Sequence, residues 1–309
     1  MANNFWKQVS RALGIVVVLA AVALVFYFLV TRENKITPPD DRLTVSTSFY
    51  PLTFLVEGIA GDLAIVNTIT PAGAEPHEYE PTTQDLVAIE KSKLLFLNGA
   101  GFESWAEGYV SAGATIVPVA DTLVTQNFVA GESVARDPHV WLDPTLAKAS
   151  AQIVLDALVA ADPGHEQEYK VNAETFLKQF DDLDAAFQAG LATCARRDIV
   201  TGHAAFGYLA ARYTLTQVPI SGLSPDEEPS PRRMAEVAEF VKNSGVEYIF
   251  FESLVNPELA VTIANEVGVK TLVLNPLEGL TPDEVSQGKN YFTEMRQNLA
   301  HLRTALQCQ

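Results

Sequence analysis

The sequence is poor in the side chains that usually carry catalysis or structural metal sites. Its 309 residues include only two cysteines and five histidines. The two cysteines lie too far apart for a zinc-knuckle pattern. Neither the His-Glu-x-x-His motif of metallohydrolases nor the Gly-x-Ser-x-Gly motif of serine hydrolases occurs. Any chemistry must therefore come from a few residues that are far apart in the chain.

Basic residues are scarce as well. The chain has 21 Lys and Arg against 38 Asp and Glu, which gives a formal net charge of −17. Residues 1–32 contain three basic residues and no acid, so residues 33–309 carry a net charge of −20. Such a surface repels nucleic acid and attracts cations over long distances. We therefore expect no nucleic-acid partner; an acidic surface that only aids solubility is the alternative interpretation.

Residues 12–30 form one uninterrupted apolar run, with Lys7 and Arg11 before it and Arg32 after it. A helix of these 19 residues would be about 28 Å long, close to the thickness of a bilayer's hydrocarbon core. The run is longer than a typical signal-peptide core, no convincing Ala-x-Ala cleavage site follows it, and no cysteine lies near it for lipid attachment. We predict an uncleaved transmembrane anchor at 12–31, with a cleaved export signal as the alternative.

Both alternatives place the rest of the chain outside the cytoplasm, either anchored to the cell membrane or periplasmic after cleavage. Residues 1–11 stay on the cytoplasmic side because they carry basic charges. Residues 32–42 (RENKITPPDDR) form a polar, Pro-containing linker. In an oxidising compartment we expect Cys194 and Cys308 to pair as a disulfide, which would close a loop of more than 100 residues. Zinc ligation by this pair is the alternative.

Beyond the linker, short β-rich runs alternate with helical patterns, which predicts parallel sheets flanked by helices. Eight strands fall into two sets of four, at residues 43–48, 64–70, 94–98 and 114–119, and at 198–201, 214–220, 248–252 and 271–274. Helices are expected at 52–60, 82–90, 103–111, 205–212, 231–243, 257–267 and 289–306. We therefore predict an α/β protein with two similar lobes, at residues 43–162 and 195–309.

One long helix is expected between the lobes, at residues 163–194. Its apolar residues recur at spacings of three and four, which is typical of a helix that buries one stripe. They are Tyr169, Ala173, Phe176, Phe180, Leu183 and Phe187. A single stiff helix that joins two lobes favours a cleft that closes by small movements. A long surface helix within one large domain is the alternative.

Three of the five histidines and one glutamate follow predicted strands or lie in Pro-bounded loops. His77 lies in PHEYEP, His139 in DPHVWLDP, His203 in TGHAAF and Glu278 in LNPLEGL. Ligands of open α/β sheets bind beyond the carboxyl ends of strands, so we expect these side chains, two from each lobe, to meet between the lobes. Three imidazoles and one carboxylate form a closed tetrahedral shell suited to zinc.

Three further residues have side chains that can bind metal. His165 and His301 lie at polar positions of helical patterns and are expected on the surface. Glu252 ends a predicted strand, and it is either an alternative carboxylate ligand or a residue that orients a histidine. No catalytic residue and no organic cofactor is indicated.

These motifs resemble the zinc/manganese solute-binding proteins of ABC transporters (cluster A-I, which includes ZnuA-, AdcA- and TroA-like proteins). PHEYEP, DPHVWLDP, GHAAFGYLA, GLSPDEEPS and LNPLEGL occur in the family's order and spacing, over nearly all of residues 43–309. The resemblance implies two lobes, each a mostly parallel four-stranded sheet with flanking helices, joined by one rigid helix. It also implies metal in the cleft between the lobes and delivery to a membrane permease.

Motif by motif, the resemblance implies that His77, His139, His203 and Glu278 are the metal ligands. His203 stands where zinc members have histidine and manganese members commonly have an acid, which indicates the zinc subtype. Imidazole also suits zinc better than manganese, which prefers oxygen ligands. Two features depart from the family. Residues 124–136 contain no histidine, so a His-rich metal-gathering loop is absent, and the N-terminal segment is typical of a spanning anchor.

We expect an exported, membrane-anchored receptor that binds Zn(II) and delivers it to an ABC importer permease without catalysing a reaction. Manganese binding by the same type of protein is the alternative. A zinc hydrolase would need three protein ligands and an open water position, so Glu278 would have to act as a base. A surface adhesin, a role sometimes attached to family members, has no support in the sequence beyond exposure at the cell surface.

Overall fold

The computed structural model describes residues 41–130 and 133–309, and Arg42–Gln309 form one compact unit. The predicted N-terminal anchor at 12–31 lies outside the described residues, as does most of the linker at 32–42. Within the described ranges, no helix combines the length and the apolar character needed to cross a bilayer.

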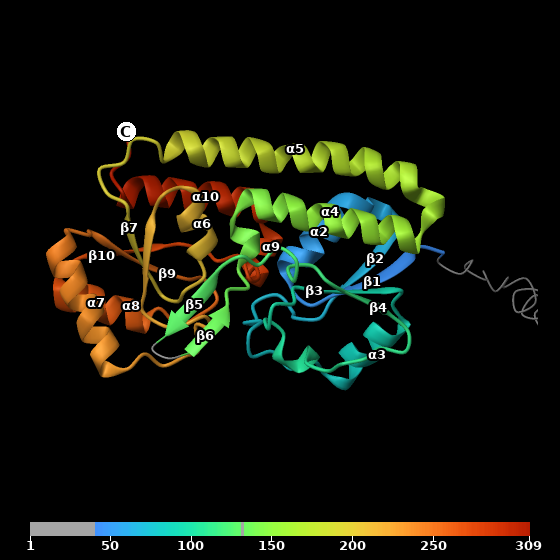
Figure 1. Ribbon diagram of the computed structural model, residues 1–309, viewed down its shortest axis with the longest axis horizontal. Coiled ribbons are helices and arrows are strands. Elements are labelled where there is room, and N and C mark those ends of the chain that lie inside the picture. Colours follow the sequence, from blue (N-terminus) through green and yellow to red (C-terminus); the bar gives the residue numbers. More distant parts are fainter. Residues whose placement is uncertain (1–40, 131–132) are drawn as a thin grey trace, which may run out of the picture. The chain divides into compact units, whose positions relative to one another are not determined.

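Two four-stranded parallel sheets form the centres of the two halves of this unit (Figure 1). The first has the strand order β2-β1-β3-β4 and the second β10-β9-β7-β8. Numbered along the chain within each half, the strands stand in the same order, 2-1-3-4. Their bounds are β1 Leu43–Thr47, β2 Ala64–Thr68, β3 Leu94–Leu97, β4 Thr115–Pro118, β7 Asp198–Thr201, β8 Thr216–Pro219, β9 Tyr248–Phe251 and β10 Lys270–Val273. The prediction of an α/β fold with two parallel four-stranded sheets is confirmed.

Helices connect the strands and cover the sheets. Their bounds are α2 Tyr50–Ala60, α3 Thr83–Lys91, α4 Pro144–Ala161, α5 Glu166–Gly190, α6 Gly207–Arg212, α7 Pro231–Ser244, α8 Glu258–Val267, α9 Pro282–Ser286 and α10 Tyr291–Ala305. Local signals set their ends. The Thr82 hydroxyl accepts the Asp85 N–H in a capping box, and the Ser230 hydroxyl caps α7. Gly245 ends α7 with φ of 71°, a left-handed conformation that glycine adopts without strain.

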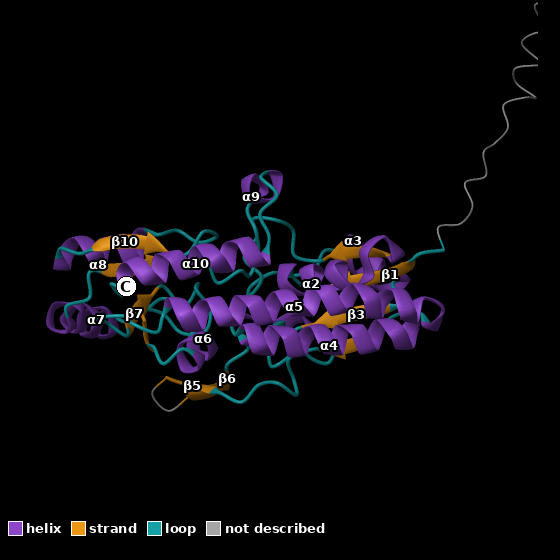
Figure 2. Ribbon diagram, turned by 90° about the horizontal axis from the view of Figure 1, so that it is seen from above, coloured by secondary structure: helices purple, strands orange, loops and turns teal. Residues whose placement is uncertain are grey.

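Helix α5 runs past both halves of the unit (Figures 1 and 2). It contacts α2 and α4 of the first half and α10 of the second. The residues that it buries are Tyr169, Ala173, Phe176, Phe180, Leu183 and Phe187, the stripe that the sequence predicts. The helix is shorter than the predicted range 163–194, because a separate 3₁₀ turn at Pro163–His165 precedes it and the chain leaves it after Gly190.

The two halves share a hydrophobic core beneath α5. Phe54 of α2 stacks on Tyr291 of α10 with ring centroids 5.5 Å apart. Phe180 of α5 lies 4.8 Å from Phe292 of α10, and Phe176 of α5 lies 5.3 Å from Phe54. Truncating one buried aromatic side chain typically costs about 3–5 kcal/mol. The halves therefore cannot separate widely without exposing a cluster whose burial contributes much of the stability.

The helix predicted at residues 103–111 is wrong. Only a 3₁₀ turn, Ser104–Ala106, forms there. Gly101 and Gly108 have φ values of 84° and 72°, so the backbone turns away from the helical conformation on both sides of the segment.

Residues 124–136, in which no element is predicted, contain an antiparallel hairpin. Strand β5 (Asn127–Ala130) pairs with β6 (Ser133–Arg136). The paired residues Val129 and Val134 are 63% and 64% exposed. Because the described side chains of these four-residue strands are exposed or, for Phe128, half-buried, their sequence lacks the alternation of apolar and polar residues that reveals a strand.

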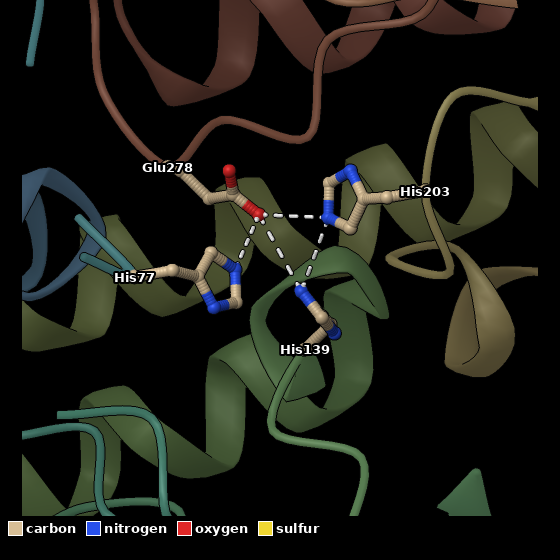
Figure 3. Close-up of side chains that lie close together, drawn as sticks. All are labelled: His77, His139, His203 and Glu278. Carbon is tan, nitrogen blue, oxygen red and sulfur yellow. Dashed lines mark hydrogen bonds and ion pairs between the residues drawn. The ribbon is translucent and has the colours of Figure 1, made fainter. Parts of the chain in front are cut away.

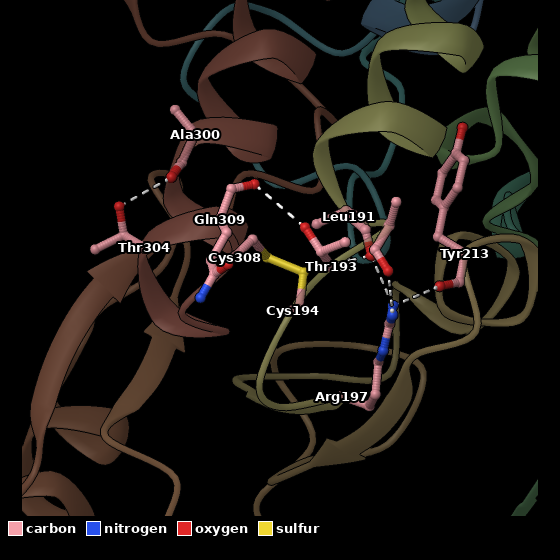
Figure 4. Close-up of a disulfide and its surroundings, with 10 residues drawn as sticks. Leu191, Thr193, Cys194, Arg197, Tyr213, Ala300, Thr304, Cys308 and Gln309 are labelled. Carbon is pink, nitrogen blue, oxygen red and sulfur yellow. Dashed lines mark hydrogen bonds between the residues drawn. A yellow bond between two sulfur atoms is a disulfide. The ribbon is translucent and has the colours of Figure 1, made fainter.

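A disulfide between Cys194 and Cys308 closes the C-terminal half (Figure 4). Cys194 follows α5 and Cys308 follows α10, and the two residues also form an isolated antiparallel bridge. The backbone N–H of Gln309 donates to the carbonyl of Thr193 at 3.1 Å. The C-terminus is thereby fixed to the segment that leaves α5.

We expect the disulfide to stabilise the fold by about 2–4 kcal/mol, because its sequence separation of 114 residues restricts the unfolded chain strongly. Replacing Cys194 and Cys308 together by Ala should lower the free energy of unfolding by this amount in guanidinium denaturation. Equal denaturation midpoints for the double variant and the oxidised wild type would contradict the prediction.

An ion pair also ties α5 to the second half. Arg212 at the end of α6 donates from Nε and Nη2 to the two carboxylate oxygens of Asp184, each at 2.7 Å. The Tyr213 hydroxyl donates to the same carboxylate at 2.9 Å. These donors, Arg212 above all, hold the pKa of Asp184 below its usual value. The bidentate geometry makes this pair stronger than an ordinary surface ion pair.

Asp184→Asn should lower the free energy of unfolding by about 1–3 kcal/mol near pH 7. A carboxylate with a depressed pKa stabilises the fold above its unfolded-state pKa, and this contribution is lost as the pH falls through the folded-state pKa. The effect should therefore shrink below about pH 4. Urea denaturation near pH 7 and again below about pH 4 measures this loss in the free energy of unfolding. Asp182→Asn is the control, because its 56% exposed carboxylate pairs with Lys178 on the same helix. An equal loss at both pH values would refute the assignment.

Candidate metal centre

Four side chains from four distant segments meet between the two halves (Figure 3). His77, His139, His203 and Glu278 each offer one ligand atom, and these atoms all lie within 4.8 Å of one another. The two histidines of lower number belong to the first half, and His203 and Glu278 belong to the second. The structure thus brings together the four residues that the sequence predicts as ligands.

The spacing of these atoms fits a small tetrahedral ion. Oε1 of Glu278 lies 3.4 Å from Nε2 of His77, 3.4 Å from Nε2 of His139 and 3.2 Å from Nε2 of His203. The Nε2 atoms of His139 and His203 are 3.4 Å apart. Zinc bonds of about 2.0–2.1 Å at tetrahedral angles place ligand atoms about 3.3–3.4 Å apart. Four of the six ligand–ligand distances therefore already fit zinc.

The centre is closed to solvent. The side chains of His139 and His203 are 0% exposed, that of Glu278 is 2% exposed and that of His77 is 8% exposed. Polar groups buried to this degree are costly unless each of them has a partner. The surrounding residues must therefore orient the four side chains as well as bury them.

Strand topology accounts for the position of His203. Strands β7 and β9 are neighbours, but the chain continues from β7 to β8 on one side and from β9 to β10 on the other. Ligand sites of open α/β sheets lie at such a switch point. His203 follows β7 and Glu252 follows β9, so the two side chains meet. Oε1 of Glu252 accepts the Nδ1–H of His203 at 2.6 Å and its backbone N–H at 3.2 Å.

His139 is held in the same way by an acid of its own segment. Oδ1 of Asp137 accepts the backbone N–H of His139 at 3.0 Å and the ring Nδ1–H at 2.8 Å. With Nδ1 bonded to a carboxylate, the Nε2 atoms of His139 and His203 face the centre and are the atoms that can bind a cation there. The tautomer and the orientation of both rings are therefore fixed by carboxylates.

The ring of His77 is positioned by packing, whereas carboxylates position the rings of His139 and His203. Glu75 accepts its backbone N–H, at 3.0 Å to Oε2, but the ring itself packs against Phe102, with centroids 4.6 Å apart. Glu75 and Asp137 each stand two residues before a ligand-set histidine with one proline between them. Side chains of this kind commonly bond the backbone two residues ahead. The acid-Pro-His pattern is thus the sequence signal by which Glu75 and Asp137 could have been identified, and the sequence interpretation missed it.

Contacts between the halves fix the loop that carries Glu278. The indole Nε1–H of Trp141, two residues after His139, donates to the carbonyl of Pro276 at 2.8 Å. The backbone N–H of Gly73 donates to the carbonyl of Leu280 at 2.9 Å. The loop of Glu278 is therefore positioned by the segments that carry the two histidines of the other half.

The buried charges determine which groups carry protons. Burial alone would lower the pKa of His203, but the charges of Glu252 and Glu278 raise it well above its usual value. Burial would raise the pKa of Glu278, but the charge of His203 and hydrogen bonds from the three imidazoles hold it well below its usual value. Burial also lowers the pKa of His77, and Glu278 opposes this only in part. A divalent cation would thus meet an ionised carboxylate and displace a proton from His203.

Glu252, the alternative carboxylate, lies outside the group of four, as do the two histidines that were expected on the surface. Glu252 occupies the orienting position beside Nδ1 of His203. Nδ1 of His301 lies 2.7 Å from the carbonyl oxygen of Val273, and Nδ1 of His165 lies 2.7 Å from Asp162. Neither of these two histidines belongs to the group of four.

The comparison with known families agrees with this geometry. Residues 45–305 match the family ZnuA, described as zinc-uptake complex component A, periplasmic. The chain belongs to this family. The resemblance inferred from the five motifs is therefore confirmed.

Individual relatives share most of the chain. The zinc-binding protein AdcA of Streptococcus pyogenes serotype M6 is 33% identical over 313 residues, which cover 94% of this chain and 61% of AdcA. The chain thus spans only about three fifths of the length of that relative.

Solved structures of related proteins have the same fold. Zn(II)-bound AdcA of Streptococcus pneumoniae superimposes with a TM-score of 0.75 and 36% identity, covering 86% of this chain and 58% of AdcA. The laminin-binding protein Lmb of Streptococcus agalactiae, described as bifunctional with adhesin and metal-transporting activity, gives a TM-score of 0.77 and 34% identity. That match covers 85% of this chain and 99% of Lmb.

We expect Glu252→Gln to lower the pKa of His203, because the charge of Glu252 is the largest of the effects that raise it. NMR titration of the imidazole protons in the metal-free protein measures this pKa. Asp184→Asn, at the α5–α6 contact, is the control and should leave it unchanged. A His203 pKa that is the same in Glu252→Gln and in the wild type would rule out the proposed orienting contact.

Proposed function

We propose that this chain binds Zn(II) through His77, His139, His203 and Glu278 and delivers it to an ABC importer permease as the substrate-binding protein. The ion is the cargo and not a resident cofactor. The observation that supports this most directly is the closed group of three imidazole nitrogens and one carboxylate oxygen at zinc-like spacing. The family match and the zinc-binding relatives agree with it.

The donor set favours zinc over the alternative, manganese. Imidazole is a borderline ligand that suits zinc, whereas manganese favours oxygen-rich octahedral sites. Zn²⁺ with the carboxylate of Glu278 leaves one positive charge. The carboxylates of Asp137 and Glu252, which bond the far side of two imidazoles, lie close to that charge and stabilise it.

The closed arrangement of the four ligands supports capture of the zinc ion and not catalysis. A catalytic zinc site keeps a position open for water or substrate, whereas this group supplies four protein ligands that are almost wholly buried. The adhesin alternative is favoured only by the likeness to Lmb, and no feature of the described surface supports it further.

We further propose that residues 43–162 and 195–309 act as two lobes and that residues 163–194, which contain α5, link them rigidly. The aromatic core that both halves share beneath α5 supports small movements around the cleft. Residues 12–31 would anchor the lobes outside the cytoplasmic membrane, near the permease, or would direct export before cleavage. The lobes work outside the cytoplasm in either case.

His203→Ala should weaken zinc binding more than about 100-fold, because it removes a fully buried ligand whose orientation is fixed. Calorimetric titration of the metal-stripped protein, with a competing chelator, measures the affinity and should give one zinc per chain. His165→Ala and His301→Ala are matched controls and should stay within about twofold of the wild type. An unchanged affinity in His203→Ala, or manganese as the metal that copurifies, would overturn the proposal.

A further inference from the structure

Two glycines, Gly202 and Gly207, lie on either side of His203 in the segment GHAAFG. Backbone conformation does not require glycine at either position, because neither residue has a positive φ. Gly207 is also the first residue of α6, and glycine is a poorer helix former than alanine. The property to explain at both positions is therefore the missing side chain and not the freedom of the backbone.

At Gly202, the space that a side chain would fill is taken by the carboxylate that orients His203. A Cβ atom on Gly202 would lie 2.8 Å from Oε1 of Glu252, which is closer than a carbon and an oxygen atom can pack. The same oxygen accepts the Nδ1–H of His203 at 2.6 Å and its backbone N–H at 3.2 Å. Glu252 is buried, so its carboxylate cannot move aside without losing these bonds.

Gly207 has the same relation to the carboxylate that orients His139. A Cβ atom on Gly207 would lie 2.7 Å from Oδ2 of Asp137. The other oxygen, Oδ1, accepts the backbone N–H of His139 at 3.0 Å and its ring Nδ1–H at 2.8 Å. Because the two oxygens belong to one rigid planar group, moving Oδ2 away from Gly207 would also displace Oδ1 from the imidazole.

The contact at Gly207 joins the two halves, since Asp137 belongs to the first half and α6 to the second. The next residue of α6 strengthens it. The buried Tyr208 hydroxyl accepts the backbone N–H groups of Thr125 at 3.0 Å and Gln126 at 3.1 Å, and it donates to the carbonyl of Asp137 at 3.3 Å. The start of α6 therefore holds the segment that carries Asp137, and a histidine of the first half depends on the second half for its orientation.

We propose that Gly202 and Gly207 are positioning residues of the metal site. Each leaves the space for the carboxylate that orients one histidine, and Gly207 does so across the two halves. A side chain at either position displaces Glu252 or Asp137, so Nδ1 of the histidine loses its acceptor and Nε2 is no longer held toward the ion. This inference rests on the proposed function, because it takes the two histidines as zinc ligands.

Gly202→Ala and Gly207→Ala test the proposal, because each adds a single methyl group. We expect the zinc affinity, measured by calorimetric titration with a competing chelator, to fall about 10- to 100-fold, the effect typical of lost contacts that orient metal ligands. Each variant should also affect one ring. In NMR spectra of the zinc-saturated protein, Gly202→Ala should change the Nδ1–H signal of His203, and Gly207→Ala that of His139.

Two other glycines provide matched controls. A Cβ atom on Gly164, in the 3₁₀ turn before α5, would meet no atom closer than 3.5 Å, so Gly164→Ala should keep the zinc affinity within about twofold of the wild type. A Cβ atom on Gly113 would overlap the backbone carbonyl of Glu90. Gly113 precedes β4, at the end of the sheet away from the metal centre. Gly113→Ala should therefore lower the unfolding midpoint but leave the zinc affinity unchanged.

Double variants show whether the effect passes through the carboxylates. In the Asp137→Ala background the space beside Gly207 is empty, so Gly207→Ala should cause little additional loss of affinity. Gly202→Ala should likewise cause little additional loss in the Glu252→Ala background. If Gly207→Ala alone does not fold, recovery of folding in the double variant with Asp137→Ala supports the proposal, and failure to recover contradicts it.

If the added methyl groups fit without displacing the carboxylates, the zinc affinity and both Nδ1–H signals stay as in the wild type. Gly207→Ala then raises the unfolding midpoint, because alanine restricts the unfolded chain. That result would overturn the proposal, as would an equal loss of affinity with and without Asp137→Ala. If the wild type binds no zinc, the proposed function fails instead. Crystal structures of the metal-free glycine variants then still show whether Glu252 and Asp137 are displaced from the imidazoles.

Discussion

The arrangement of the centre depends on one buried carboxylate oxygen. Oε1 of Glu278 lies 3.2–3.4 Å from three imidazole nitrogens that belong to both halves of the molecule. Nitrogen lone pairs that converge in a buried space repel one another unless a cation or a proton lies between them. In the metal-free protein the negative oxygen of Glu278 raises the pKa of His203, and a proton on that imidazole lies between the two groups. The halves are thus held at the cleft by a polar contact whose geometry is also that of a metal site, and the aromatic core under α5 limits how far they can move apart.

The fold brings these side chains together at little cost in free energy. Both sheets have the same strand order, and at the switch point of the second sheet the ends of β7 and β9 place His203 beside Glu252. The first half reaches an equivalent result by local means, because an acid two residues before each histidine bonds the backbone of that histidine. The strand order of the second sheet thus orients His203, and local turns orient His77 and His139. Neither arrangement requires a strained backbone at the histidines.

Much of this could be predicted from the sequence, and the omissions have physical reasons. The eight strands and the four converging residues were predictable because buried parallel strands are strongly apolar and ligand loops follow their ends. The helix predicted at 103–111 does not form, because Gly101 and Gly108 adopt positive φ values. In the β5–β6 hairpin the paired Val129 and Val134 are both exposed, so no alternating pattern reveals its strands. The acid-Pro-His pattern is present in the sequence at both His77 and His139, so the roles of Glu75 and Asp137 could also have been predicted.

Ligand spacing alone does not select the ion. An octahedral ion such as Mg²⁺, with bonds of about 2.0–2.1 Å, has neighbouring ligands about 2.8–3.0 Å apart. That differs only modestly from the 3.2–3.4 Å around Oε1 of Glu278. Selection must therefore come from the number of donors. Asp137 and Glu252 occupy the second nitrogen of His139 and His203, so each ring can supply one bond only. The second oxygen of Glu278 is a further protein donor, so binding through one oxygen favours a four-coordinate ion and binding through both favours a larger shell.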